Sequence, residues 1–205
     1  MNEILFNLIS SWPGLMGRLD PALVEDSLVL LDFLPPGPQR LVDVGSGGGL
    51  PGLPLRLARP ELSLTLVEAN RRKAAFLVQA VARLGLDGVE VLAARAEDAA
   101  REPGHREAYD VATARALAPM PVLAELCLPF LRVGGRLLAM KSGAVEEALA
   151  AEPAIKRLGG RLLAVTPAAS AARSLGQVVV VEKVSPTPPE YPRRAGVPGR
   201  RPLAG

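Results

Sequence analysis

The amino-acid sequence predicts an α/β fold with a seven-stranded sheet that is mostly parallel and has an antiparallel last strand. From Arg40 onward, short apolar segments of strand length alternate with segments of helical periodicity, an order typical of parallel sheets with right-handed crossovers. A loop without helical pattern joins the last two strands, as in an antiparallel hairpin. A glycine-rich turn, Gly45 to Gly49, follows the first strand at the edge where such folds bind ligands.

The elements follow one another in a regular order. Strands are expected at Leu41–Val44, Ser63–Val67, Val89–Ala93, Tyr109–Thr113, Gly135–Met140, Arg161–Val165 and Gln177–Val184. Helices are expected near Pro51–Ala58, Asn70–Leu84, Ala96–Ala100, Met120–Phe130 and Ala144–Leu158. In the helix that follows the second strand, Asn70 is the expected N-cap and Gly85 the stop signal. The expected apolar stripe of this helix comprises Leu77, Val78, Val81 and Leu84.

Two segments flank this domain, which is expected to span residues 39–184. Residues 1–38 should form a short helical extension packed on the core, in which Asp20 can cap the second helix and Pro21 fits its first position. The run from Pro35 to Pro38 ends this extension. The tail, residues 185–205, is basic and rich in proline, so we expect it to lie extended on the surface, with its arginines in contact with RNA or docked against the domain.

Composition excludes several classes of function. The 205-residue chain has one cysteine, Cys127, and one histidine, His105, so we expect no internal disulfide, no Cys/His nucleophilic pair and no metal site. Its apolar runs are too short for a membrane span, and its first residues lack the basic region of a signal peptide. We therefore expect a cytoplasmic protein without membrane contact, and a monomer by default.

The spacing of the glycine-rich turn distinguishes between cofactors. A dinucleotide-binding turn needs a third glycine three residues after the second, which would be position 50, and this position is Leu50. The pattern is instead Asp43-x-Gly45-x-Gly47-x-Gly49, which resembles the first loop of class I S-adenosylmethionine-dependent methyltransferases, a Rossmann-like fold. Glycines in this turn would let the backbone approach a ligand closely.

Further candidate residues follow the next strands at the same edge of the sheet. Glu68 ends the second strand, where a carboxylate can accept hydrogen bonds from a ribose diol in methyltransferases and NAD enzymes alike. Ala96 and Glu97 follow the third strand, in the region that borders the adenine ring in this architecture. Arg115 follows the fourth strand, where ligands bind.

Longer motifs make the comparison specific. They are the run LVDVGSGGGLPGLPLRLARPELSLTLVEANRRKAAFL, the segments RAEDAA, TARALAP and GGRLLAMKS, and the tail YPRRAGVPGRRPL. Together they resemble the RsmG (GidB) family, bacterial methyltransferases that modify N7 of a guanine in 16S ribosomal RNA, over roughly residues 20–205. The resemblance implies S-adenosyl-L-methionine as the cofactor and 16S ribosomal RNA or the small ribosomal subunit as the partner.

The resemblance also implies roles for single residues. Cofactor contacts are implied at Gly45, Leu50, Glu68, Ala69, Asn70, Ala96, Glu97 and Arg115. The glycine loop adds Asp43, Ser46, Gly47 and Gly49 to the expected cofactor-binding residues. RNA contacts are implied at Lys73, Arg95, Lys141 and Arg173, and the basic tail adds Arg193 and Arg194. The N-terminal segment departs from the family, because Leu23 stands where the family has a histidine.

The implied reaction needs no general base. Guanine N7 carries a lone pair and no proton at neutral pH, so it can attack the sulfonium methyl directly, and the protein must supply alignment. We expect the catalytic residues Arg115 and Lys141 to face the cofactor and to hold guanine O6, a phosphate or the cofactor, because a donor on N7 would block its attack. Aromatic residues make up 3% of the chain, so RNA affinity should be mainly ionic.

Two other functions stay open on the sequence. The first is an oxidoreductase on a dinucleotide-binding fold, which Leu50 argues against and which would bind NAD(P)H. The second is a non-catalytic module that binds S-adenosylmethionine and assembles on RNA or ribosomal particles. The same glycine loop and acid serve binding and catalysis, so binding without turnover would indicate the second function.

Overall fold

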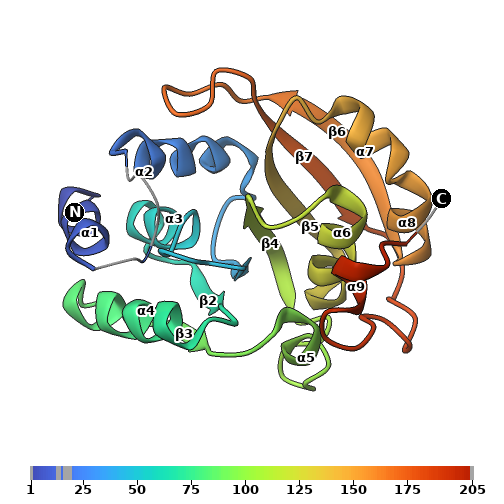
Figure 1. Ribbon diagram of the computed structural model, residues 1–205, viewed down its shortest axis with the longest axis horizontal. Coiled ribbons are helices and arrows are strands. Elements are labelled where there is room, and N and C mark those ends of the chain that lie inside the picture. Colours follow the sequence, from blue (N-terminus) through green and yellow to red (C-terminus); the bar gives the residue numbers. More distant parts are fainter. Residues whose placement is uncertain (1, 13–14, 16–19, 204–205) are drawn as a thin grey trace.

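The computed structural model describes residues 2–12, 15 and 20–203, and it contains a seven-stranded sheet with helices on both faces (Figure 1). The strands are β1 Arg40–Val44, β2 Ser63–Val67, β3 Val89–Leu92, β4 Tyr109–Arg115, β5 Leu131–Ser142, β6 Gly160–Pro167 and β7 Gly176–Lys183. Their order is β3-β2-β1-β4-β5-β7-β6, and only β7 runs antiparallel to its neighbours. The predicted sheet, with its antiparallel last strand, is confirmed.

The helices of the described residues pack in two groups. They are α1 Asn2–Ser11, α2 Ala22–Ser27, α3 Gly52–Ala58, α4 Arg71–Arg83, α5 Ala96–Ala99, α6 Met120–Cys127, α7 Val145–Ala150, α8 Glu152–Arg157 and α9 Val197–Arg200, with 3-10 turns at Leu28–Phe33 and Leu128–Phe130. Helices α1 to α4 share one buried cluster with the sheet, and α6 to α8 share the other. In Figure 1 the first group lies to the left of β4 and the second to its right.

Alternation along the strands divides the core between these two clusters. In β1, Leu41 is buried on the side of α3 and α4, whereas Val42 and Val44 are buried on the side of α6. In β2, Leu64 and Leu66 point to the first side and Val67 to the second. This two-residue period is what a strand covered on both faces requires. The carboxyl ends of these strands therefore stand between two packed helical layers.

The long helix expected at Ala144–Leu158 is wrong in detail, because the structure has α7 and α8 there with Ala151 between them. Pro153 lies in the first turn of α8 and has no N–H to donate to the preceding turn, so the helix cannot run through it. The expected helix Met120–Phe130 likewise changes after Cys127 into a 3-10 turn that contains Pro129. In both cases a proline sets the boundary.

The apolar stripe expected on α4 is also partly wrong. Val78 is 56% exposed, while Phe76 is buried and packs edge-on against Trp12 of the N-terminal segment. The helix ends are as predicted: Oδ1 of Asn70 accepts the N–H groups of Arg72 and Lys73, and Gly85 has a left-handed φ of 61°. The N-terminal extension thus selects which side chains of α4 face inward.

The tail does not lie extended on the surface as expected. Residues 187–203, here called the docked tail, return to the domain and include the helical turn α9, which packs against α6. Arg106 donates to the carbonyl oxygens of Thr187 and Tyr191, both at 2.9 Å, and Leu203 is buried in the cluster of α6. Figure 1 shows α9 beside α6 and above α5. The prolines keep the docked tail irregular, and these contacts hold it in place.

Candidate functional site

A cavity of about 440 Å³ opens at the carboxyl ends of β1, β2, β3 and β4. Its walls are formed by Val44, Gly45, Gly47, Val67, Glu68, Ala69, Lys73, Ala94, Arg95, Ala96, Glu97, Ala116, Leu117, Ala118, Val122, Leu126, Gly196 and Gly199. Eight of the predicted site residues are among them: Gly45, Gly47, Glu68, Ala69, Lys73, Arg95, Ala96 and Glu97. The edge of the sheet predicted from the sequence is therefore where the structure is hollowed.

The glycine loop wraps one end of the cavity. Gly45, Gly47 and Gly49 have left-handed φ values of 73°, 56° and 84°. A Cβ on Gly45 would lie 2.5 Å from Leu117 Cδ1, and one on Gly49 would lie 2.4 Å from Leu53 Cδ1. At Gly47 a Cβ would meet only the carbonyl oxygen of Gly45, at 3.9 Å. A side chain at Gly45 or Gly49 would thus have to displace a leucine side chain, and the left-handed φ favours glycine at all three positions.

Glu68 lines the cavity beside the glycine loop. Its Oε2 accepts the N–H of Gly47 at 2.9 Å, and its Oε1 accepts the N–H of Asn70 at 2.7 Å. The residue is only 9% exposed, so its carboxylate has a fixed orientation toward the cavity that it lines. Each oxygen keeps further acceptor capacity for a hydroxyl donor. The carboxylate of Glu68 can therefore accept hydrogen bonds from hydroxyl groups in the cavity.

Asp43 supports the loop from behind and does not line the cavity. Its Oδ1 accepts the hydroxyl of Thr113 at 3.0 Å, and its Oδ2 accepts the N–H of Gly52 at 3.2 Å. Burial raises the pKa of this carboxyl to about 6, although these two hydrogen bonds lower it. Asp43 therefore ties β1 to β4 and to the start of α3, which fixes the loop between them.

Other residues predicted to bind the cofactor also lie behind the cavity wall. Ser46 donates its hydroxyl to the carbonyl oxygen of Asp43 at 2.8 Å, and Leu50 is buried in the cluster of α3 and α4. Asn70 uses its side chain to cap α4. Gly49 is packed against Leu53. These four positions shape the loop, and none of them lines the cavity.

The opposite end of the cavity is closed by α5 and the docked tail. Glu97, 6% exposed, accepts the N–H of Gly196 at Oε1 over 2.7 Å. Arg95 is exposed just before α5. The apolar side chains of Val122 and Leu126 on α6 line the wall between them. This end therefore combines an apolar surface with a buried carboxylate.

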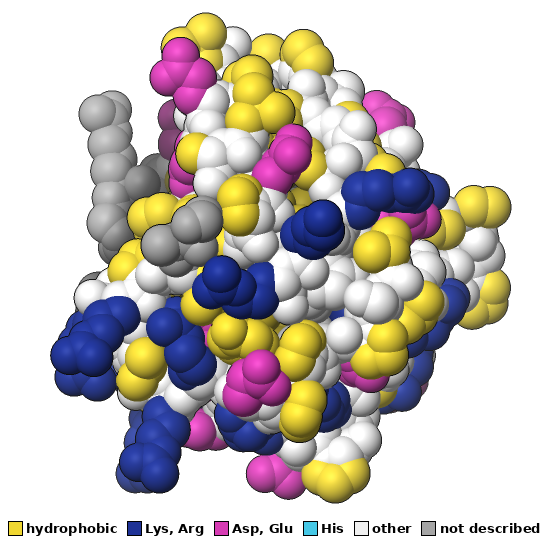
Figure 2. All heavy atoms as spheres, turned by 90° about the vertical axis from the view of Figure 1, so that its right-hand side faces the viewer, with side chains coloured by type: hydrophobic (Ala, Val, Ile, Leu, Met, Phe, Trp, Pro, Cys, Tyr) yellow, Lys and Arg dark blue, Asp and Glu magenta, His cyan; other side chains and the backbone are white. Residues whose placement is uncertain are grey.

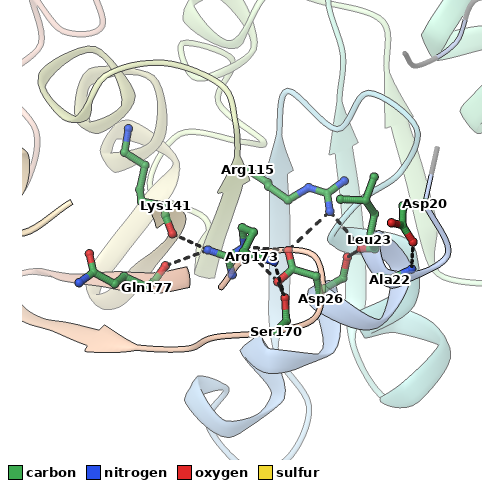
Figure 3. A network of polar contacts seen from close by, with 10 residues as sticks. Asp20, Ala22, Leu23, Asp26, Arg115, Lys141, Ser170, Arg173 and Gln177 are labelled. Atoms are coloured by element: carbon green, nitrogen blue, oxygen red, sulfur yellow. Dashed lines mark hydrogen bonds and ion pairs between the residues drawn. The ribbon is translucent and has the colours of Figure 1, made fainter. Parts of the chain in front are cut away.

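The predicted catalytic residue Arg115 lies next to the cavity but does not line it. Its Nη1 donates to the carbonyl oxygen of Leu23 at 3.0 Å and lies 3.9 Å from Oδ2 of the fully buried Asp26 (Figure 3). Burial lowers the pKa of Arg115, although the nearby carboxylates of Asp26 and Asp43 raise it. The guanidinium of Arg115 is therefore directed toward Leu23 and the buried acid Asp26 on α2, and not into the cavity.

Asp26 also holds the predicted RNA-binding residue Arg173. Nε of Arg173 donates to Oδ2 and Oδ1 of Asp26 at 2.8 and 3.0 Å, and Ser170 donates its hydroxyl to Oδ1 at 2.6 Å. Nη1 of Arg173 donates to the carbonyl oxygen of Lys141 (Figure 3). Asp26 thus joins α2, the β6–β7 loop and the ends of β4 and β5.

Lys141 and Arg193, the other two internal cations among the predicted residues, also have partners. Nζ of Lys141 donates to Oε1 of Glu147 at 2.8 Å and to the carbonyl oxygen of Ala118 at 3.1 Å. Arg193 forms an ion pair with Glu125, while Arg194 is exposed. Lys141 therefore does not line the cavity, because its ammonium group is held by Glu147 on α7 and by the carbonyl oxygen of Ala118.

Sequence reasoning missed several residues that shape the site. They are Asp26, Ala116, Leu117, Ala118, Glu125, Gly196 and Gly199. Glu125 did carry a signal, since it is an acid within the apolar segment MPVLAELC, and a fully buried acid needs a partner. Nothing in the sequence near Gly196 points to the cavity, because its place there depends on the fold of the whole chain.

Two absences apply to the described residues. No group of three or more His, Cys, Asp or Glu residues among them is arranged to hold a metal ion. Within the same part of the chain, no helix has the length and apolar character needed to cross a membrane.

Comparison with known proteins gives the family. Residues 5–175 match the family described as rRNA small subunit methyltransferase G. A relative from Roseiflexus castenholzii, a ribosomal RNA small subunit methyltransferase G, is 51% identical over 167 residues, which cover 81% of this chain and 71% of the relative. One from Dehalococcoides mccartyi is 47% identical over 169 residues, covering 82% and 72%. A solved SAM-dependent methyltransferase from Aquifex aeolicus shares the fold, with a TM-score of 0.62 and 16% identity over 90% of this chain and 99% of that one. The chain belongs to the rRNA small subunit methyltransferase G family.

Proposed function

We propose that this chain transfers the methyl group of S-adenosyl-L-methionine to N7 of a guanine in 16S ribosomal RNA. The observation that carries the proposal is the cavity at the carboxyl ends of the strands, where Glu68 is fixed by the N–H groups of Gly47 and Asn70. Family membership supports the methyl transfer and the small-subunit RNA. The shared fold with a SAM-dependent methyltransferase supports the choice of cofactor.

The residues of the cavity fit this cofactor. Glu68 offers oxygen acceptors for the two ribose hydroxyls, and the glycine loop lets backbone approach the sugar and the amino-acid end. Val122 and Leu126 offer an apolar face for the adenine ring, as ligand pockets commonly do. When bound, S-adenosylmethionine supplies an electrophilic methyl group on a positively charged sulfur.

The chain itself has to align the target base, and no residue has to remove a proton from it. Guanine N7 attacks through its lone pair, so the protein contributes positioning rather than base catalysis. Lys141 holds the carbonyl group of Ala118, which lines the cavity, and Arg115 precedes the lining residue Ala116 and is anchored to Leu23 on α2. We assign both residues the positioning of the cavity wall at Ala116 and Ala118.

RNA contacts are proposed for the cations that stay available at the surface. Arg95 and Arg194 are exposed, and Lys73 lines the cavity. Figure 2 shows one face of the molecule, on which Lys and Arg side chains gather in the lower half among acidic and hydrophobic ones. Exposed Lys and Arg side chains of this kind can neutralise RNA phosphates.

The proposal is tested by transfer of labelled methyl groups to small ribosomal subunits that lack their own modification, followed by mapping of the modified base. Label at N7 of one guanine is the expected result, with the chain monomeric in solution. Label at another atom would refute the N7 assignment. Binding of S-adenosylmethionine without any transfer would indicate the non-catalytic module, and binding of NAD(P)H in its place would indicate an oxidoreductase.

A further inference from the structure

The docked tail supplies part of the cavity wall. Gly196 and Gly199, which follow the last strand of the sheet, line the cavity together with α5 and α6. Gly196 has a left-handed φ of 79°, and its N–H points to Oε1 of Glu97 at 2.7 Å. Glu97 lines the same cavity, so one carboxylate both faces the ligand space and holds the tail.

A buried ion pair fixes the tail three residues before this point. Glu125 on α6 is fully buried, and within the described part of the chain Arg193 provides the hydrogen bonds to its carboxylate. The side chain of Arg193 donates from Nε to Oε1 of Glu125 at 2.8 Å and from Nη2 to Oε2 at 2.6 Å. Its backbone N–H also donates to Oε1, at 2.8 Å. A buried carboxylate that loses such a partner is strongly destabilised, so the docked arrangement is favoured.

Helix α6 carries both the acid that binds the tail and two residues of the cavity wall. Val122 and Leu126 line the cavity, and Glu125 lies between them in α6. Arg193 itself does not line the cavity. On both sides of Arg193 the tail is held independently, by Arg106 at Thr187 and Tyr191 and by the burial of Leu203. Loss of the Arg193 contact would therefore loosen one stretch and leave its ends attached.

We propose that Arg193 and Glu125 are positioning residues for the cofactor: their ion pair holds Gly196 and Gly199 against the end of the cavity opposite the glycine loop. This inference rests on the proposed function, since the ligand is S-adenosylmethionine. Binding of the cofactor and docking of the tail are then coupled, and such coupling acts equally in both directions. A residue that served only stability would show no such coupling.

The first test measures the affinity of the full chain for S-adenosylmethionine by titration calorimetry. Arg193→Gln should raise the dissociation constant about tenfold or more, and Arg193→Lys, which keeps a charged donor, should raise it less. Arg161→Gln is the matched control, because it removes a 2.6 Å ion pair with Glu182 from the β6–β7 edge and should change the affinity less than about twofold. Unchanged affinity in folded Arg193→Gln would overturn the inference.

The second test uses the unmodified chain and stays decisive if Arg193→Gln fails to fold. Hydrogen exchange of the amides in residues 187–203 should slow on addition of S-adenosylmethionine, because ligand binding favours the docked tail. Exchange that is the same with and without bound cofactor would refute the coupling while leaving the proposed function intact. Failure of the wild-type chain to bind S-adenosylmethionine at all would overturn both.

Discussion

At the scale of the single residue, the buried carboxyl of Asp43 behind the glycine loop makes a pH-dependent contribution to the stability of the fold. Asp43 is 1% exposed, and burial raises the pKa of its carboxyl from 3.8 to about 6. Between about pH 4 and pH 6 the folded chain therefore holds a proton at Asp43 that the unfolded chain has lost. Because the folded state binds more protons in this window, the contribution of Asp43 to stability falls as the pH rises through it and is constant above it.

Replacing Asp43 by Asn removes this titration. The free energy of unfolding of the wild type, minus that of Asp43→Asn, should fall by roughly 2 kcal/mol between about pH 4 and pH 7, since one pKa unit corresponds to about 1.4 kcal/mol and the unfolded carboxyl is already partly ionised at pH 4. Urea denaturation of both proteins across this range measures the difference. A difference that does not change with pH would mean that Asp43 titrates in the folded chain as it does in the unfolded one.

Gly47 is the loop residue whose side chain would enter open space at the cavity. Gly47→Arg should abolish binding of S-adenosylmethionine, because the new side chain competes for the ligand's volume, and calorimetry measures this. Gly85→Arg is the control, since Gly85 also has a left-handed φ, has open space around it and lies at the end of α4. The two variants share a backbone strain of about 1–2 kcal/mol, so equal loss of binding in both would disprove the local effect.

At the scale of the elements, Asp26 joins parts of the chain that are far apart in sequence. It lies on α2 and is bound by Ser170 and Arg173 from the β6–β7 loop, with Arg115 of β4 nearby. The side chains of Arg115 and Arg173 are themselves only 11% and 13% exposed. The carboxylate of Asp26 thus joins α2, the β6–β7 loop and β4, so we expect the packing of these three elements to be cooperative.

Asp26→Asn should lower the free energy of unfolding by about 3 kcal/mol, because it leaves two poorly solvated guanidinium groups without their counter-charge. The corresponding fall in melting temperature is about 6–12 °C, measurable by calorimetry. Arg161→Gln removes an ion pair whose arginine side chain is 65% exposed, and it should cost less than about 1 kcal/mol. A similar small change in Asp26→Asn would show that water replaces the ion pair.

The elements also show what a sequence can predict. The strands, the glycine loop and the helix cap at Asn70 were predictable, because the sequence pattern that indicates each of them lies within a few neighbouring residues. Glu68 was predictable for the same reason, since the end of a strand fixes its edge of the sheet. The directions in which the side chains of Arg115 and Lys141 point were not predictable, because they depend on Asp26 and Glu147. Only the folded chain determines where these two acids lie.

At the scale of the whole molecule, charge is distributed between internal pairs and the surface. Arg173 and Arg193 are paired with the buried acids Asp26 and Glu125, so they are poor candidates for neutralising phosphates. Arg95 and Arg194 are exposed. The net charge of +3 is small, so the RNA affinity depends on where cations lie rather than on how many there are.

The double variant Arg95→Gln/Arg194→Gln should bind the small ribosomal subunit more weakly and with less dependence on salt. The slope of log affinity against log salt concentration should become shallower by about 1.5, because each lost phosphate contact removes about 0.7–0.9. Filter binding at several salt concentrations measures the slope. Arg157→Gln on α8 is the control variant. If the double variant shows the same slope as Arg157→Gln, neither Arg95 nor Arg194 contacts a phosphate.

Because Gly196 and Gly199 follow β7 in the chain, this part of the cavity wall is synthesised after the sheet. Protein chains are synthesised from the N-terminus, so a growing chain that has just completed β7 contains every strand of the sheet but lacks one wall of its cavity. The hydrophobic layers can then pack before the methyl donor can be held. On the proposal above, full affinity for the cofactor would arise only once residues 196–199 have been made and have docked beside α6.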